Sequence, residues 1–106
     1  MIANLIVCWT TVATPSEAEK LATALLEESL AACIQIDSAT QSHYRWNGEQ
    51  HCDEEHRLWI KSTDAKWESL KSRLQQLHPY DEPQIVMARL ADASEGYARW
   101  VESECS

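Results

Sequence analysis

The residues best placed to do chemistry lie in the segment 77–83, Leu-His-Pro-Tyr-Asp-Glu-Pro. Pro79 fixes its own φ and moves His78 out of the α region, so a helix that reaches this point must end there. Pro83 closes the turn. A histidine, a tyrosine and two carboxylates are therefore held at one corner. His78 is a candidate metal ligand or acid–base group, and the alternative is a structural histidine whose ring hydrogen-bonds the backbone.

A second group of possible ligands occupies residues 51–56, His-Cys-Asp-Glu-Glu-His. It contains both soft and hard donors, and zinc or copper could use His51, Cys52 and His56. No second ligand pair completes a known spacing. We therefore favour a solvated hairpin tip over a specific metal site.

The sequence contains no convincing catalytic constellation. Ser42, Ser62 and Ser94 lie in no recognisable nucleophile elbow. Glycine occurs only at positions 48 and 96, which excludes a glycine-rich phosphate loop. We expect binding rather than turnover, and a hydrolase that uses His78 and Glu55 is the minority alternative.

Composition limits the partners. A chain of 106 residues suits a single domain over residues 1–106. The net charge of −8 argues against nucleic acid and anionic membranes and is compatible with metal cations. No apolar run approaches the roughly 20 residues that span a bilayer, and Met1 to Asn4 lacks a basic region, so we expect no signal peptide. Four cysteines without a Cys-x-x-Cys pair favour a reducing cytoplasm.

Hydrophobic periodicity indicates the elements that position these residues. A strand is predicted over 4–12, followed by a helix that Thr14 caps and Pro15 begins. The apolar stripe of this helix comprises Ala18, Leu21, Ala22, Leu25, Leu26 and Leu30. Extended chain is predicted at 31–36. A hairpin turns at Asn47-Gly48, and its return strand runs from about 55 to 62, with the polar segment before it allowed as loop.

The second half of the chain predicts two helices and a strand. Asp64 is expected to cap a helix whose inner face carries Trp67, Leu70, Leu74 and Leu77. A strand over 84–90 follows the corner. A last helix is predicted at 94–104, with Tyr97, Trp100 and Val101 facing inward. The fold class is therefore α+β, a ferredoxin-like βαββαβ sandwich with an extra C-terminal helix, in which two helices cover one face of a four-stranded sheet.

The opposite face of this sheet predicts an oligomer. The first strand is apolar at consecutive positions, and Trp59 points away from the side that Leu58 and Ile60 share. Such a face exceeds the apolar patch that a soluble monomer normally exposes. We infer an obligate homo-oligomer of closed symmetry.

Several spaced motifs resemble the CutA family of divalent-cation tolerance proteins. They are Leu30-Ala31-Ala32-Cys33, Ser42-x-Tyr44-x-Trp46-x-Gly48, Glu55 with Leu58-x-Ile60-Lys61, His78-Pro79-Tyr80-x-x-Pro83, and Tyr97-x-x-Trp100. The resemblance covers nearly the whole chain. It implies a homotrimer of ferredoxin-like subunits with PII-like architecture, and tolerance of copper and other divalent cations.

The resemblance also implies copper ligands, which this chain keeps only in part. A bacterial member's proposed ligands are a cysteine near the end of the first strand and two adjacent histidines at the second-helix corner. Thr10 stands at the cysteine position, with Cys8 two residues earlier and nearly 7 Å away, and Leu77 replaces one histidine. His78 alone is retained, and copper or another divalent cation is the expected ion.

Five residues are predicted to line a ligand-binding or inter-subunit cleft: Cys33, Trp46, Glu55, Lys61 and Tyr80. Cys33 is also expected to pack as a small core residue, and Cys105 is expected near a frayed terminus, where it is either inert or exposed. The alternative function from another class is a PII-like sensor trimer. It would bind a small anionic ligand between subunits through Lys61 and backbone amides.

Overall fold

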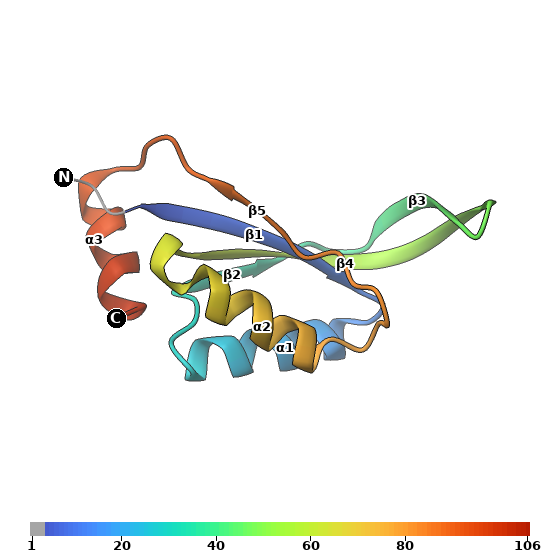
Figure 1. Ribbon diagram of the computed structural model, residues 1–106, viewed down its shortest axis with the longest axis horizontal. Helices are drawn as coiled ribbons and strands as arrows, with labels where there is room; N and C mark the ends of the chain where they lie inside the picture. Colours follow the sequence, from blue (N-terminus) through green and yellow to red (C-terminus); the bar gives the residue numbers. More distant parts are fainter. Residues whose placement is uncertain (1–3) are drawn as a thin grey trace.

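The computed structural model describes residues 4–106, so the expectation about the first three residues lies outside it. The elements are β1 (Leu5–Val12), α1 (Pro15–Glu27), β2 (Cys33–Ile36), β3 (Thr40–Trp46), β4 (Glu49–Thr63), a 3₁₀ turn (Asp64–Lys66), α2 (Trp67–Leu77), β5 (Val86–Arg89) and α3 (Glu95–Glu104). Helices α1 and α2 lie together on one side of the sheet, and α3 stands beside one end of it (Figure 1). The α+β, ferredoxin-like prediction with an extra C-terminal helix is confirmed.

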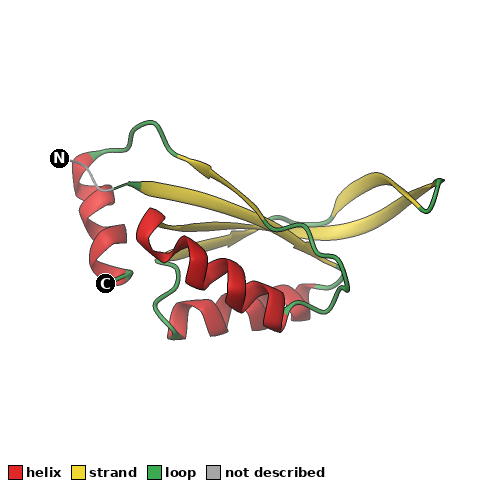
Figure 2. Ribbon diagram, viewed as in Figure 1, coloured by secondary structure: helices red, strands yellow, loops and turns green. Residues whose placement is uncertain are grey.

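The strands form an antiparallel sheet in the order β2-β4-β1-β5, with β3 paired to the other half of β4. Cys8 of β1 lies opposite Ile60 on one side and Met87 on the other. The β3–β4 hairpin extends beyond the helix-covered body (Figure 2), and the molecule is 47 Å long but only 26 Å wide. The hairpin is thus exposed on both faces.

The main core lies between the sheet and the two long helices. Its fully buried members include Ile6, Cys8, Val12, Leu25, Leu58, Ile60, Leu70 and Leu74. Alternate residues of β1 and β4 point to this side because strand side chains alternate between faces. Burial of each large aliphatic side chain contributes roughly 1.5–3 kcal/mol. Helix α1 begins as predicted, with the Thr14 hydroxyl accepting the Glu17 N–H at 3.2 Å.

A short break divides the extended region that the sequence predicted before the hairpin, so the sheet has five strands rather than four. Strand β2 ends at Ile36 and β3 begins at Thr40, while β4 runs through unbroken. Asp37 makes the last contact before the break, where its N–H donates to the Arg57 carbonyl at 2.9 Å. The side chain of Asp37 accepts hydrogen bonds from Arg57 and Trp59 of β4.

The hairpin strands are longer than predicted, and the loop allowed before residue 55 is wrong. Thr40 pairs with Glu55 at one end and Trp46 with Glu49 at the other. The polar side chains of this segment do not prevent strand formation. The ladder provides hydrogen bonds for the backbone, and both faces of the hairpin are open to water, so the side chains stay hydrated. The turn itself is as expected, since Asn47 and Gly48 have φ of 52° and 81°.

Asp64 does not cap α2. Its carboxylate instead accepts the Arg89 Nε–H at 3.1 Å and also pairs with Nη2 at 3.0 Å. Helix α2 begins after Lys66 without a side-chain cap. The last strand is also shorter than the predicted 84–90, because only Val86–Arg89 pair with β1.

Helix α3 packs through small residues, so the predicted inward positions of Tyr97 and Trp100 are wrong. These two side chains are 38% and 43% exposed, whereas Ala98 and Val101 are buried against Leu5. The small residues let the helix approach the sheet closely. Cys105 is 3% exposed rather than at an exposed terminus, and its Sγ lies 3.7 Å from the Ser62 hydroxyl.

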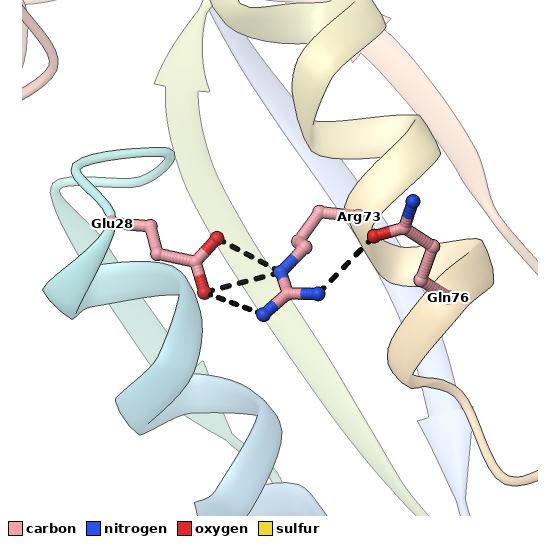
Figure 3. A network of polar contacts seen from close by, with 3 residues as sticks. All are labelled: Glu28, Arg73 and Gln76. Atoms are coloured by element: carbon pink, nitrogen blue, oxygen red, sulfur yellow. Dashed lines mark hydrogen bonds and ion pairs between the residues drawn. The ribbon is translucent and has the colours of Figure 1, made fainter.

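An arginine joins the two helices that cover the sheet (Figure 3). Arg73 of α2 donates from Nε to Glu28 Oε1 at 2.8 Å and from Nη2 to Oε2 at 3.0 Å. Its Nη1 donates to Gln76 at 3.1 Å. Glu28 is the C-cap residue of α1, so this fork fixes the end of one helix against the other.

Candidate functional site

A cleft of about 930 Å³ opens where the hairpin leaves the sheet. Its walls come from three places: the end of β1, the hairpin, and the corner 80–84. Acidic residues dominate the polar residues that line it, namely Asp53, Glu54, Glu55, Asp81 and Glu82, beside His43 and His51. The aromatic lining is Tyr44, Trp46 and Tyr80. The cleft is therefore strongly negative and can attract cations.

Both ring nitrogens of His78 are occupied behind this cleft. Nε2–H donates to the Thr11 carbonyl at 2.9 Å, and Nδ1 accepts the Tyr80 N–H at 3.1 Å. Burial lowers the pKa of His78, against the Thr11 hydrogen bond and the negative charges of Glu17 and Glu55, which act to raise it. The ring is therefore neutral and holds the corner to β1. Metal binding to His78 would require one of the two hydrogen bonds to break.

Tyr80 and Glu55 join the corner to the root of β4. The Tyr80 hydroxyl donates to Glu55 Oε2 at 2.6 Å, and Glu55 is only 9% exposed. Burial and the adjacent carboxylate raise the pKa of Tyr80, so the phenol stays protonated and keeps donating. In the hydrolase alternative, Glu55 and His78 would each have to give up one of these contacts in order to act.

The five predicted cleft residues separate into two groups. Trp46, Glu55 and Tyr80 line the cleft. Cys33 lies opposite Lys61 in the β2–β4 ladder, and Lys61 Nζ donates to Gln35 at 2.8 Å. Glu55 and Lys61 share a face of β4, but six residues separate them by about 20 Å. Lys61 thus lies outside the single-chain cleft.

The residues of the segment 51–56 do not converge, so the three-ligand hypothesis for His51, Cys52 and His56 is wrong. His51 stacks on Tyr44 at 5.3 Å between ring centroids, and His56 Nδ1 contacts the Asp37 carbonyl at 3.4 Å. Cys52 contacts His43. Over residues 4–106, no three His, Cys, Asp or Glu side chains are placed to share a metal.

Cys8 and Thr10, the two residues at or near the cysteine position of the family's copper pattern, are both buried. Cys8 is fully buried, and desolvation raises the pKa of its thiol to about 12. A protonated, inaccessible thiol is not a metal ligand. Thr10 is also fully buried, on the helix-covered side of β1.

Asp37 is a structural anchor that sequence reasoning missed. Its carboxylate accepts the Trp59 Nε1–H at 2.9 Å and the Arg57 Nε–H at 3.0 Å. These two hydrogen bonds lower the pKa of Asp37, and the one from Trp59 contributes the most. The available signal was the pair Arg57 and Trp59 at alternate positions, which places two side-chain donors on one face of β4.

Comparison with known proteins identifies the family. Residues 6–104 match the family described as CutA1 divalent ion tolerance protein. The chain belongs to the CutA1 family. The divalent-cation tolerance protein CutA of Thermus thermophilus is 43% identical over 89 residues, which cover 82% of this chain and 86% of the relative. The CutA protein of Pyrococcus horikoshii is 35% identical over 100 residues, 94% of this chain and 97% of the relative.

Solved CutA structures have the same fold. CutA from Synechococcus elongatus superposes with a TM-score of 0.93 at 36% identity, over 98% of this chain and 92% of that one. CutA1 from Oryza sativa gives 0.95 at 27% identity, over 99% and 96%. The relatives from Thermus thermophilus and Pyrococcus horikoshii are named as divalent-cation tolerance proteins, neither as enzymes nor as PII-like sensors, so the family does not favour the PII-like alternative. Within residues 4–106, no helix has the length and apolarity to cross a membrane.

Proposed function

We propose that this CutA1-family chain acts in cation tolerance as a cytoplasmic homotrimer that binds divalent ions rather than transforming a substrate. The acidic cleft at the hairpin root carries the proposal, as a concentration of negative charge that attracts cations; among residues 4–106 it does not hold three side chains already placed to share one ion. Five acidic residues line it, in a chain of net charge −8. Carboxylate oxygens and imidazole nitrogens are ligands of divalent metals. All four cysteines are free, which is consistent with a reducing compartment.

Copper is the ion we propose, with His78 as the ligand that this chain shares with the family's pattern. Of the two contacts of its ring, the bond from the Tyr80 N–H is the longer, at 3.1 Å against 2.9 Å. Nδ1 is therefore the atom that a metal would capture. The Thr11 carbonyl would keep the ring oriented through Nε2–H, as a second-shell partner does in many metal sites.

The trimer is supported by the helix-free side of the sheet. Trp9 and Trp59 are half-buried there and meet edge to face at 5.5 Å, and Val86 is 47% exposed. Cys33 and Lys61 lie on this same side. Sister chains that cover this side would place these two residues at a subunit boundary, as the sequence predicted for them.

Native mass spectrometry and calorimetric titration of metal-free protein test the proposal together. We expect a trimer that binds Cu²⁺, with an affinity that falls at least about tenfold in His78→Ala and is retained in the matched control His56→Ala. Copper affinity unchanged in a folded His78→Ala variant would remove His78 as a ligand. A wild-type protein that binds neither Cu²⁺ nor Zn²⁺ would refute cation binding.

A further inference from the structure

An exposed thiol and an exposed imidazole meet across the hairpin. Cys52 of β4 lies opposite His43 of β3, and Cys52 Sγ is 3.5 Å from His43 Nε2. Both side chains are open to solvent. Alternation places them on the other side of the ladder from Tyr44 and Asp53, whose side chains hydrogen-bond to each other. His43 also borders the cleft but Cys52 does not, and the family's copper pattern uses neither residue.

The separation of the two atoms matches that of two ligands on one tetrahedral ion. A metal–sulfur distance of about 2.3 Å and a metal–nitrogen distance of about 2.05 Å, at the tetrahedral angle, put sulfur and nitrogen about 3.6 Å apart. The observed 3.5 Å therefore requires almost no movement. The rigid ladder holds both Cα atoms, so the pair is organised before an ion arrives.

The donor types select the ion. A thiolate with an imidazole suits Cu⁺ and Zn²⁺, whereas Mg²⁺ prefers oxygen ligands. Glu54 is two residues from Cys52 on the same side of the strand and adds a negative charge nearby. Arg45 also lies on that side, but its guanidinium donates to the Gly48 carbonyl at 3.3 Å, toward the turn.

We propose that Cys52 and His43 form an exchangeable site for one thiophilic cation, Cu⁺ or Zn²⁺. Sγ and Nε2 each donate an electron pair, the Cys52 thiol proton is released to water, and no redox change occurs. No third protein ligand meets them among residues 4–106. Solvent completes the coordination, so the ion exchanges easily. The inference adds a second site to the proposed cation binding but does not rest on it, because it uses neither His78 nor any role in tolerance.

Two measurements on the full, metal-free chain test the site under a non-thiol reductant. Zn²⁺ and Cu⁺ are each titrated against a chromophoric chelator, with Mg²⁺ as a hard-ion control. Iodoacetamide labelling with peptide mapping then follows each cysteine separately. We expect Zn²⁺ or Cu⁺ to slow labelling of Cys52 but not of the half-buried Cys33. We expect the affinity at this site to fall at least about tenfold in Cys52→Ser and in His43→Ala.

Matched controls come from the same chain. Cys33→Ser removes the half-buried thiol of the β2–β4 ladder, and His56→Ala removes an imidazole of β4 that contacts the Asp37 carbonyl instead; both should retain the site. If only one of Zn²⁺ and Cu⁺ binds and protects Cys52, the site is supported and its metal is identified. The proposal would be overturned if neither ion slowed labelling of Cys52 in the wild-type protein, a result that does not depend on any variant folding. Unchanged affinity in Cys52→Ser would also overturn it. His78→Ala separates the two proposals, because it should leave protection of Cys52 intact even if it lowers the copper affinity measured by calorimetry.

Discussion

At the residue scale, His78 couples the corner to pH. Burial lowers its pKa from the ordinary 6.5, so the folded state favours the neutral ring. The unfolded chain takes up a proton near pH 6.5 while the folded chain does not, and the proton uptake favours unfolding. This part of the stability is present above about pH 6.5. It is lost progressively as the pH falls toward the lowered pKa of the folded state.

We predict that the urea midpoint falls between about pH 7.5 and about pH 5.5, and that it falls less in His78→Gln. The glutamine amide can donate to the Thr11 carbonyl, as Nε2–H does, but it does not titrate. Denaturation curves at the two pH values measure the difference. An equal fall in both proteins would assign the pH dependence to other groups.

Thr10 carries a second prediction at this scale. Its side chain is fully buried, and its Oγ1 has no hydrogen-bond partner among the described residues. A buried hydroxyl without a partner costs about 1–3 kcal/mol, and valine has nearly the same shape. We predict that Thr10→Val stabilises the protein by about 1 kcal/mol. Urea unfolding measures this, and a destabilised variant would show that the hydroxyl is hydrogen-bonded in solution.

At the element scale, the Glu28–Arg73 fork positions α1 against α2. Lysine keeps the charge but cannot form two parallel hydrogen bonds. We predict that Arg73→Lys lowers the denaturation midpoint at low salt, and less so at high salt, because ions screen exposed pairs. Arg99→Lys is the control, since Arg99 pairs with Glu95 within one exposed helix. Equal effects of the two substitutions would mean that the fork does not hold the helices together.

The elements also show which structural features can be predicted from neighbouring residues and which depend on residues far away in the chain. The start of α1, the Asn47-Gly48 turn and the helix stop at His78 could be predicted, because each depends on residues within one turn of chain. Asp64 could not, since its partner Arg89 is 25 residues away. The face of α3 depends on Leu5, near the opposite end of the chain.

The candidate site shows the same limit. Its aromatic and acidic members Trp46, Glu55 and Tyr80 could be predicted to line a cleft. Their assembly depends on contacts between residues 25 and 67 positions apart, Tyr80 with Glu55 and His78 with Thr11. No periodic pattern encodes such contacts. The Cys52–His43 contact arises from the register of a hairpin whose strands extend beyond the range that the sequence predicted.

At the scale of the whole molecule, the proposed trimer requires one surface that contacts a sister chain. Val86 on the helix-free side is 47% exposed, and Leu26 on the helix layer is 44% exposed. The two side chains are thus matched in exposure and differ in the layer that carries them. If sister chains cover the helix-free side, only Val86 lies at the interface.

We predict that Val86→Glu lowers the sedimenting mass from trimer toward monomer, while Leu26→Glu leaves the trimer intact. A carboxylate buried at an apolar interface loses its hydration without gaining a partner, whereas one on the open helix surface stays in water. Sedimentation equilibrium of both variants beside the wild type measures the effect. Dissociation by Leu26→Glu alone would place the interface on the helices. A wild-type chain that sediments as a folded monomer would remove the trimer, and with it the subunit boundary proposed for Cys33 and Lys61.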